Sequence, residues 1–467
     1  MFKKFKKIFA GFSMLALSAV LVACGAAATP DPDPVVTPPE VTPPATVEVP
    51  VEEAEWTPAE AGDVTIRFSW WGVEDRAILT EQALDVFRAR YPNVTILTEW
   101  SAFGGHLDNL TLQLATGEEP DLMQVNYAWI HSLSPGGNNA FLDLNTVAHV
   151  LDLTEWSQDD LAFLIVGDEL AAVPYGQNGR VVVYNRLLLQ EFGLSEFPTT
   201  TEDLIAFGTL VSEGNNLGMD LGYNRHALAN LDNLLFDLAT LTWLYNTTGR
   251  TLQEGGQLLH TVEEVQAIFD LIGVLQETGT VPNPLQETAG FPNHNDPIWT
   301  EGRAGGALVW VSDVHNFFNT FMGGDQWDDL GVALLPTPAG YPQITMQRPS
   351  FTHAISRNTD HPEVVAYLLN FLYTDPLAIV PLAQAGGIPF STTASYYAQD
   401  VLVWPQIEGI ELLALGLGVI DEYFEDPRLR NPRQDIFGQF RHGVIDSAEA
   451  AQRFINEQQT ALNDIFG

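Results

Sequence analysis

Patterns typical of strands and of helices alternate from residue 64 onward, and this alternation constrains the fold more than any other feature of the chain. A strand is expected at 64–70, where apolar and polar residues alternate, and a helix at 75–90, where apolar residues recur at helical spacing. A strand at 94–98, a helix at 106–115 and a strand at 121–125 follow. Strands that alternate with helices predict an α/β fold whose sheet is largely parallel and is flanked by helices on both faces.

The same patterns continue toward the end of the chain. The expected order is strand 180–184, helices 201–211, 230–245 and 262–276, strands 307–311 and 331–336, helix 361–373, and mostly helix from about residue 401. Roughly 400 residues are too many for one ordinary hydrophobic core, so we expect two domains. Ligands of such sheets bind beyond the carboxyl ends of the strands.

The first 24 residues predict a secretory signal. Four lysines, at positions 3, 4, 6 and 7, precede an apolar run over 8–23 that is shorter than the roughly 20 residues needed to span a bilayer. The run closes on Leu-Val-Ala-Cys, which resembles the lipobox of bacterial lipoproteins. This resemblance implies that residues 1–23 are a signal peptide, that Cys24 carries lipid, and that the mature protein is tethered outside the cytoplasmic membrane. The alternative is an ordinary secretory signal with an incidental cysteine.

Residues 24–60 combine this cysteine with a segment rich in proline, threonine, valine, glutamate and alanine. Such a composition cannot bury a core and favours extended polyproline II, so we expect a semi-rigid tether. At about 3.1 Å per residue, a tether of this length reaches on the order of 110 Å when fully extended.

The charge of the chain is strongly negative. All lysines lie in the signal, so beyond residue 23 the formal charge is −44, from 16 arginines and 60 carboxylates. That sign repels phosphate backbones and anionic lipid headgroups, which disfavours nucleic acid and polybasic membrane binding. A neutral ligand is the simpler expectation.

Missing residue types exclude several kinds of catalysis. Without lysine there is neither a Walker A loop nor Schiff-base chemistry, and the single cysteine leaves no thiol nucleophile, cysteine-ligated zinc or disulfide. The chain has no H-E-x-x-H or G-x-S-x-G motif. The acidic loop at 323–329 lacks the EF-hand glutamate, so we expect no metal and no cofactor. Acid and base catalysis by two carboxylates stays open.

Five stretches resemble the extracellular solute-binding proteins of ABC importers, in particular their sugar-binding group of maltose- and glucose-binding proteins. They are 115–121, 173–175 with 183–186, 197–204, 299–304 and 386–389. They match a Gly and Pro-Asp turn, a Pro-Tyr then Tyr-Asn-Lys crossover, a Pro-x-Thr helix start, a Gly-Arg-Ala segment and a late Gly-x-Pro hinge. Arg186 replaces the usual lysine. The order and spacing of these stretches carry the resemblance, which covers nearly everything from residue 64 onward.

The resemblance implies a type II periplasmic-binding-protein-like fold with two α/β lobes, each a sheet flanked by helices. The N-terminal lobe is expected at 61–178 and 337–386, and the C-terminal lobe at 179–336 and 387–467. Hinge crossovers are expected near 176–181, 335–337 and 386–390. Ligand would lie in the interlobe cleft and be trapped when the lobes close.

A sugar site needs aromatic platforms for the ring faces and polar side chains for the hydroxyls. Trp70 and Trp71 end the first strand, where such a sheet presents its ligand, and Glu74 and Asp75 follow. The alternative for these two acids is favourable charge at a helix N-terminus. The other candidates in the first lobe are Gln124, Asn126, Tyr127 and Tyr175.

Candidates of the second lobe and the crossovers are Trp310, Asp313, Trp243, Arg348 and Gly387. By the resemblance, Ser312 stands where relatives place a stacking tryptophan, so Trp310 either compensates or is core. Trp243 lies in an apolar helix and has the same core alternative.

These features together predict a lipid-anchored, non-enzymatic substrate-binding subunit of an ABC importer that captures a mono- or short oligosaccharide. The expected partners are the sugar and the permease subunits, with no nucleic acid, membrane contact only through the lipid, and a monomeric state. Three alternatives stay open: the same fold binding a polyol, peptide or polyamine, an extracellular carbohydrate hydrolase, and a surface adhesin.

Overall fold

The computed structural model describes residues 56–72, 74–135, 138–216, 224–229, 233–284, 294–386, 388–415, 417–418, 420 and 423–467. The signal, Cys24 and most of the expected tether lie outside these residues. The last tether residues are described: Trp56 packs edge-on against Tyr367, with ring centroids 6.3 Å apart, and Pro58–Glu60 forms a 3-10 turn. The described chain is therefore already packed on the folded domain at Trp56.

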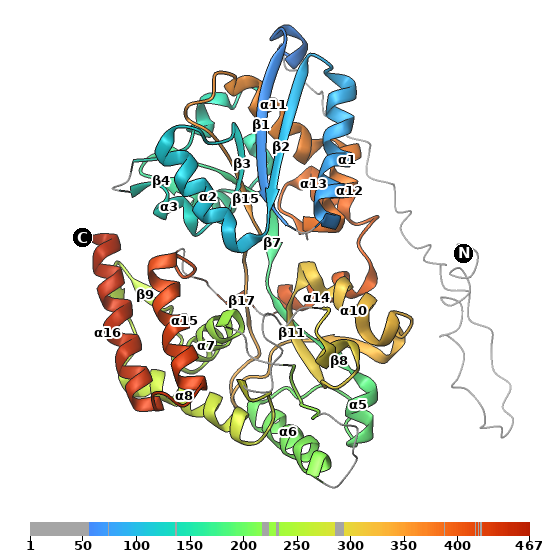
Figure 1. Ribbon diagram of the computed structural model, residues 1–467, viewed down its shortest axis with the longest axis vertical. Helices are drawn as coiled ribbons and strands as arrows, with labels where there is room; N and C mark the ends of the chain where they lie inside the picture. The colour runs from blue at the N-terminus through green and yellow to red at the C-terminus, as the bar shows by residue number, and fades with distance from the viewer. Residues whose placement is uncertain are drawn as a thin grey trace, which may run out of the picture. The chain divides into compact units, whose positions relative to one another are not determined.

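A five-stranded sheet organises the first part of the fold (Figure 1). Its strand order is β2 (Val94–Ser101), β1 (Val64–Trp71), β3 (Leu122–Val125), β15 (Thr352–Ile355) and β6 (Val173–Pro174). β1 runs parallel to β2 and β3, whereas β15 is antiparallel to β3 and β6. The parallel arrangement expected from the sequence is therefore found for three of these five strands, namely β2, β1 and β3.

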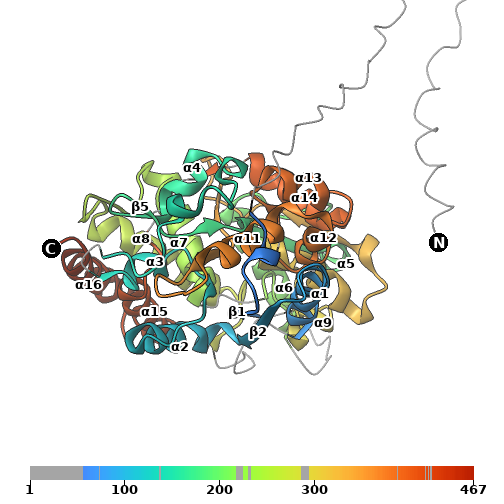
Figure 2. The same ribbon diagram turned by 90° about the horizontal axis from the view of Figure 1, so that it is seen from above.

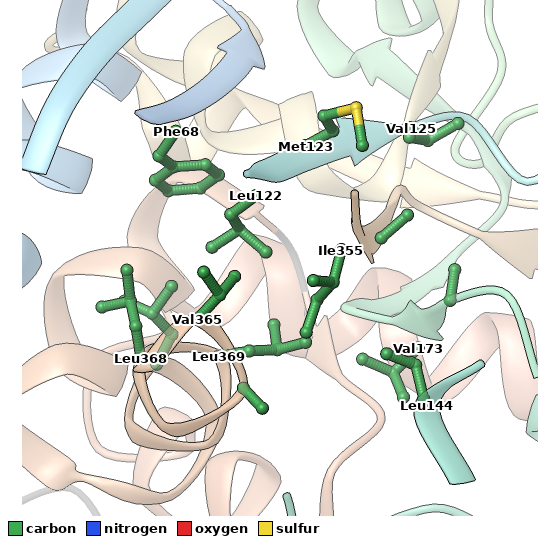
Figure 3. Close-up of a cluster of buried hydrophobic side chains, with 14 of the residues drawn as sticks. Phe68, Leu122, Met123, Val125, Leu144, Val173, Ile355, Val365, Leu368 and Leu369 are labelled. Atoms are coloured by element: carbon green, nitrogen blue, oxygen red, sulfur yellow. The ribbon is translucent and has the colours of Figure 1, made fainter. Parts of the chain in front are cut away.

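Helices cover this sheet and close the first core. They are α1 (Glu74–Arg90), α2 (Phe103–Thr116), α3 (Trp129–Ser132), α4 (Gln158–Leu161), α11 (Pro362–Thr374), α12 (Pro376–Gly386) and α13 (Thr392–Ala398). α1 and α12 pack together although they are far apart in sequence (Figure 2). Figure 3 shows the core itself, where Phe68 and Leu122 of the sheet meet Val365 and Leu368 of α11.

A three-stranded sheet organises the second part, in the order β11 (Gly306–Trp310), β8 (Arg180–Asn185) and β12 (Leu330–Ala333). Every residue of β8 is buried, because the two faces of the strand pack in different hydrophobic clusters. Val182 belongs to one cluster and Val181 to the other. Both pairings are antiparallel, contrary to the sequence expectation. More than one helix separates β8 from β11 in the chain, so no single crossover forces the strands to run in the same direction.

The second part is otherwise helical. Its helices are α5 (Arg186–Glu191), α6 (Thr201–Asn216), α7 (Asn233–Thr248), α8 (Val262–Glu277), α9 (Pro297–Thr300), α10 (Val314–Thr320), α14 (Trp404–Leu415), α15 (Pro427–Arg441) and α16 (Ser447–Phe466). α15 packs on α7 and α16, and α16 packs on α8. Phe236 stacks on Phe437 with ring centroids 3.9 Å apart, which joins α7 to α15.

Shorter elements complete the described residues. Two-stranded sheets pair β4 (Ile165–Val166) with β5 (Glu169–Leu170), β9 (Gln253–Glu254) with β10 (Gln257–Leu258), and β13 (Thr345–Met346) with β17 (Leu417–Gly418). Further 3-10 turns lie at Leu144–Val147, Leu153–Glu155, Ala162–Leu164, Val311–Asp313, Phe321–Gly323 and Trp327–Asp329.

A small linking sheet lies where the chain passes between the two parts. Its order is β14 (Arg348–Pro349), β7 (Gly176–Asn178) and β16 (Ile388–Pro389), and both pairings are antiparallel. Val173 and Phe351, on either side of this sheet in the chain, pack in the first core, whereas Val182 and Met346 pack in the second. Three distant segments are therefore held together by backbone hydrogen bonds at this crossing.

No single helix in the described part of the chain is long and apolar enough to cross a membrane, and only the bent pair α11 and α12 passes that test on length and composition.

Candidate ligand-binding cavity

A cavity of about 210 Å³ lies between segments that pack in the two different parts of the fold. From the first part it is lined by Trp71, Arg76, Phe103, Asn126 and Phe351, from the second by Trp310, Ser312, Glu425 and Arg430, and from the linking region by Asn178, Arg348 and Ser350. Trp71 ends β1 and Asn126 follows β3, so the cavity lies at the carboxyl ends of two parallel strands. This is where α/β sheets bind ligands.

Aromatic rings form one wall of the cavity. Trp71 lies edge-on to Phe103, with ring centroids 5.5 Å apart, and 5.4 Å from Trp129. Trp129 stacks on Phe103 at 5.2 Å. Each ring is thus fixed by its neighbours, so the wall presents a preformed apolar surface to a ligand.

Amides and hydroxyls also line the cavity. Asn178 donates from Nδ2 to Ser312 Oγ at 2.9 Å and accepts from the Gly179 backbone N–H at 3.0 Å, which fixes its orientation. Asn126 Oδ1 accepts from the Ala128 N–H at 3.0 Å. The buried Ser350 hydroxyl forms no hydrogen bond with the described residues. These groups match the donors and acceptors of a polar ligand.

Cationic side chains surround Trp310 at the second wall. The guanidinium carbons of Arg180 and Arg348 lie 3.6 Å and 4.1 Å from the centroid of its ring. Arg348 Nε lies 3.3 Å from Glu425 Oε1, and these two side chains are only 8% and 5% exposed. Two guanidinium groups so close to one ring leave Trp310 largely covered by protein cations.

Arg76 of α1 completes the cationic lining from the first part. Its guanidinium carbon lies 5.4 Å from the centroid of the Phe351 ring. Burial lowers the pKa of Arg76, and the charges of Tyr175 and Asp313 oppose that shift. Asp313 belongs to the second part of the fold, so the Arg76 guanidinium lies close enough to be influenced by a carboxylate of that part.

A model of the family named "Bacterial extracellular solute-binding protein" matches residues 71–378. The chain belongs to this family. The protein therefore binds a solute and functions outside the cytoplasm. The sequence expectation of this family is confirmed.

Solved structures agree with this solute-binding protein in fold. A periplasmic oligogalacturonide-binding protein from Yersinia enterocolitica, in complex with saturated digalacturonic acid, is 23% identical, covers 86% of this chain and 100% of its own, with a TM-score of 0.76. The GacH receptor of Streptomyces glaucescens is 15% identical with a TM-score of 0.71, covering 86% of this chain and 99% of its own. Maltose-bound T. maritima MalE3 is 17% identical with a TM-score of 0.70, covering 85% and 99%. The expected two-lobed type II fold is confirmed.

The candidate residues predicted from the sequence fall into three groups in this solute-binding protein. The cavity of about 210 Å³, called the main cavity from here on, is lined by four of them: Trp71, Asn126, Trp310 and Arg348. Trp70, Gln124 and Tyr175 line a smaller neighbouring cavity of about 20 Å³, which shares Arg76 and Phe351 with the first. The other candidates whose side chains are described, Glu74, Tyr127, Trp243 and Asp313, line neither cavity.

The smaller cavity contains buried polar atoms without a hydrogen-bond partner among the described residues: Trp70 Nε1, Gln124 Nε2 and the Tyr175 hydroxyl. Tyr175 stacks on Phe351 at 4.6 Å, and burial raises the pKa of its phenol. Because Phe351 lines both cavities, the stack forms part of the wall between them.

The remaining candidates have other surroundings. Trp243 is buried in the second core and donates from Nε1 to the Pro336 carbonyl at 2.9 Å. Tyr127 is buried, with its ring 5.7 Å from the Arg348 guanidinium carbon. Asp313 accepts from Asn316 Nδ2 at 2.6 Å, and Glu74 is exposed at the start of α1. The Asp75 side chain and Gly387 lie outside the described residues.

The candidates named from the sequence omit two thirds of the described lining: Arg76, Phe103, Asn178, Ser312, Ser350, Phe351, Glu425 and Arg430. Phe103 could have been found, because it directly follows the second strand of the parallel set. Arg430 and Glu425 have no local signal, since they come from the C-terminal helical part, whose packing the sequence pattern leaves open. Among the described residues, no three His, Cys, Asp or Glu side chains gather closely enough to hold a metal.

Proposed function

We propose that this solute-binding protein captures a sugar, either a monosaccharide or a short oligosaccharide, in the main cavity. The observation that carries the proposal is the pairing of an aromatic wall, Trp71 and Phe103, with the oriented polar groups of Asn126, Asn178 and Arg348. A sugar has flat apolar ring faces and a belt of hydroxyls, and it matches both surfaces. A volume of about 210 Å³, below the roughly 300–1,000 Å³ of sites for drug-sized ligands, favours a small solute.

Structural relatives support a sugar ligand. The Yersinia protein binds an oligogalacturonide, T. maritima MalE3 binds maltose, and the Streptomyces receptor binds acarbose. All of them share the fold of this chain, which supports a saccharide as its solute.

Capture is coupled to closure of two lobes. We assign the N-terminal lobe to the elements of the first core and the C-terminal lobe to those of the second, with the linking sheet of β7, β14 and β16 as the hinge. Met346 packs in the second core, so 337–347 moves with the C-terminal lobe rather than with the N-terminal one. α13 packs on α11 and α12, so the chain crosses for the last time after residue 398.

The protein serves an ABC importer as a monomeric, non-enzymatic subunit that hands its sugar to the permease. Lipid on Cys24 anchors the protein to the cell membrane, and the proline-rich tether determines how far the binding domain extends from it. Two-carboxylate hydrolysis needs a pair of acids about 5–10 Å apart. Glu425 is the single carboxylate among the described residues that line the main cavity, which favours binding over hydrolysis.

Titration calorimetry of the purified protein against a panel of mono- and disaccharides, polyols, dipeptides and polyamines tests this function. We expect saturable binding of one or more sugars and a decrease in the radius of gyration on binding. Trp71→Ala should abolish binding, whereas Trp404→Ala, which changes an exposed tryptophan outside the cavity, should bind normally. Binding confined to a polyamine or a peptide would refute the sugar assignment. Release of shortened glycan products would refute the non-enzymatic one.

A further inference from the structure

The smaller cavity, of about 20 Å³, lies between the first sheet and two of the helices that cover it. β1 contributes Trp70 and β3 contributes Gln124, and the two are neighbours because the residues just before them are paired across the strands. Tyr175 directly follows β6. Leu372 of α11 and Leu382 of α12 line the cavity from the helices. Three polar side chains from three separate segments therefore meet at one small cavity.

Each of these three polar side chains has a buried atom that lacks a hydrogen bond. Trp70 is 1% exposed, and Gln124 and Tyr175 are each 2% exposed. Trp70 Nε1, Gln124 Nε2 and the Tyr175 hydroxyl have no hydrogen-bond partner among the described residues. Thr80, by contrast, lines the same cavity but donates its hydroxyl to the Arg76 carbonyl at 2.9 Å. Buried polar groups in folded proteins are nearly always hydrogen-bonded, so the three atoms need a partner inside the cavity.

We infer that the smaller cavity is a binding site for one internal water molecule. A buried water needs at least about 10–15 Å³ of such space and makes about three hydrogen bonds to polar groups that would otherwise have none. The cavity offers about 20 Å³ and three such groups. The water oxygen accepts from Trp70 Nε1 and Gln124 Nε2, and one of its protons is donated to the Tyr175 hydroxyl oxygen.

A neutral oxygen suits this cavity better than an ion. The lining includes the apolar side chains of Phe68, Leu372 and Leu382. Burying a charge among apolar groups costs far more free energy than burying a neutral polar molecule. Trp70 Nε1 and Gln124 Nε2 are both donors, so they do not coordinate a cation. Water meets both conditions, because it is uncharged and it both accepts and donates hydrogen bonds.

The internal water lies behind a wall of the main cavity. Phe351 lines both cavities and stacks on Tyr175, with ring centroids 4.6 Å apart. Trp70, Gln124 and Tyr175 thus bind water, in place of the ligand contacts expected for them from the sequence. The water site is formed by the protein alone, so it does not depend on which solute fills the main cavity.

A crystal structure of the solute-free protein, at a resolution that shows ordered waters, tests this site. We expect one peak of water density at about 2.7–3.2 Å from Trp70 Nε1, Gln124 Nε2 and the Tyr175 hydroxyl. Absence of the peak would refute the site, and a peak as strong as a chloride ion or shaped like a cryoprotectant would refute the water assignment. The same peak should stay in crystals soaked in glucose or in maltose. A sugar hydroxyl in its place would overturn the inference, because the smaller cavity would then belong to the sugar site.

Variants that remove single partners locate the water. Tyr175→Phe keeps the ring that stacks on Phe351 but lacks the hydroxyl, and Gln124→Met lacks the amide. Each should lower the occupancy of the water peak at least two-fold. Tyr184→Phe is the matched control, because the Tyr184 hydroxyl donates to Glu196 at 3.0 Å and does not line the cavity, so the peak should be unchanged. Full occupancy in both cavity variants would refute these groups as the partners of the water.

Discussion

Arg180 and Trp310 are cross-strand partners on β8 and β11, and the Arg180 guanidinium carbon lies 3.6 Å from the centroid of the Trp310 ring. Their strands run antiparallel, so the carboxyl end of β11 lies next to the amino end of β8. That end of β8 follows the hinge strand β7, and this position brings Trp310 to Arg348 as well. The pair therefore connects the second sheet, the linking sheet and the cavity.

Trp310→Ala should weaken binding of the cognate sugar at least ten-fold. The change removes the ring against which Arg180 and Arg348 lie, so both guanidinium groups lose their fixed positions. Calorimetry measures the affinity, and thermal unfolding checks that the variant is folded. Trp310→Phe keeps an aromatic face and should recover most of the affinity. Normal binding by the alanine variant would mean that this ring does not organise the site.

Glu425→Gln should lower the stability of the protein without ligand. Removing one partner of a buried ion pair costs about 3–5 kcal/mol, because Arg348 keeps its charge without compensation, and an isosteric glutamine retains part of the contact. The free energy of unfolding without ligand should therefore fall by roughly 2–4 kcal/mol. Urea denaturation measures this loss. Glu457→Gln, in a more exposed pair, should change the free energy of unfolding only slightly.

His353 makes the stability of the N-terminal lobe depend on pH. Its ring is buried, its Nδ1 lies 2.9 Å from the Tyr373 hydroxyl, and burial lowers its pKa to about 3. The unfolded chain binds a proton near pH 6.5 and the folded one does not, so this contribution to stability is complete above pH 6.5 and is lost as the pH falls toward 3.

Between pH 7 and pH 5 the loss should reach about 2 kcal/mol. Urea denaturation of the wild type and of His353→Asn at both pH values measures this loss of stability. The other histidines contribute equally to both proteins, so the wild type should lose more stability than the variant. Equal losses would contradict a neutral, buried His353.

Gly331 and Gly438 should respond oppositely to alanine. Gly331 of β12 is paired with Tyr184 of β8, and a Cβ at this position would overlap the Tyr184 ring. Gly331→Ala should therefore destabilise the fold by about 1–3 kcal/mol through overpacking. Gly438 lies in the interior of α15 with open space around it, so Gly438→Ala should stabilise by about 0.5–1 kcal/mol. Thermal unfolding of both variants measures the difference, and a loss at both positions would contradict this local packing.

Cys24→Ser should release the protein from the membrane. A serine provides no thiol for lipid attachment, so the variant should lose incorporation of labelled palmitate and move from the membrane to the soluble extracytoplasmic fraction. Sugar affinity should stay unchanged, because the cavity lies wholly within the part of the chain beyond residue 70. Labelling and fractionation of expressing cells measure both effects. Continued labelling of the serine variant would refute Cys24 as the lipid site.

Local patterns predicted most of the elements of this fold. Residues 64–70 alternate because one side of β1 packs against α11, and α2 ends at Thr116 because Gly117 adopts the left-handed conformation that closes it. Strand direction in the second sheet was not predictable, since it depends on how several intervening helices return the chain. At the cavity, Trp71, Asn126, Trp310 and Arg348 lie beside strand ends or crossovers, and such positions are visible in a sequence.

The sequence by itself determined the alternation of strands and helices, the absence of lysine and thiol chemistry beyond residue 24, and the five stretches that indicate the family. These depend on local spacing and on residue types, which need no folded chain. Tertiary structure decided which distant residues meet at the cavity. Arg76 and Arg430 are separated by hundreds of residues, and only packing around the linking sheet brings them to one place. Side chains interact according to their distance in space rather than in sequence, so composition could not predict this lining.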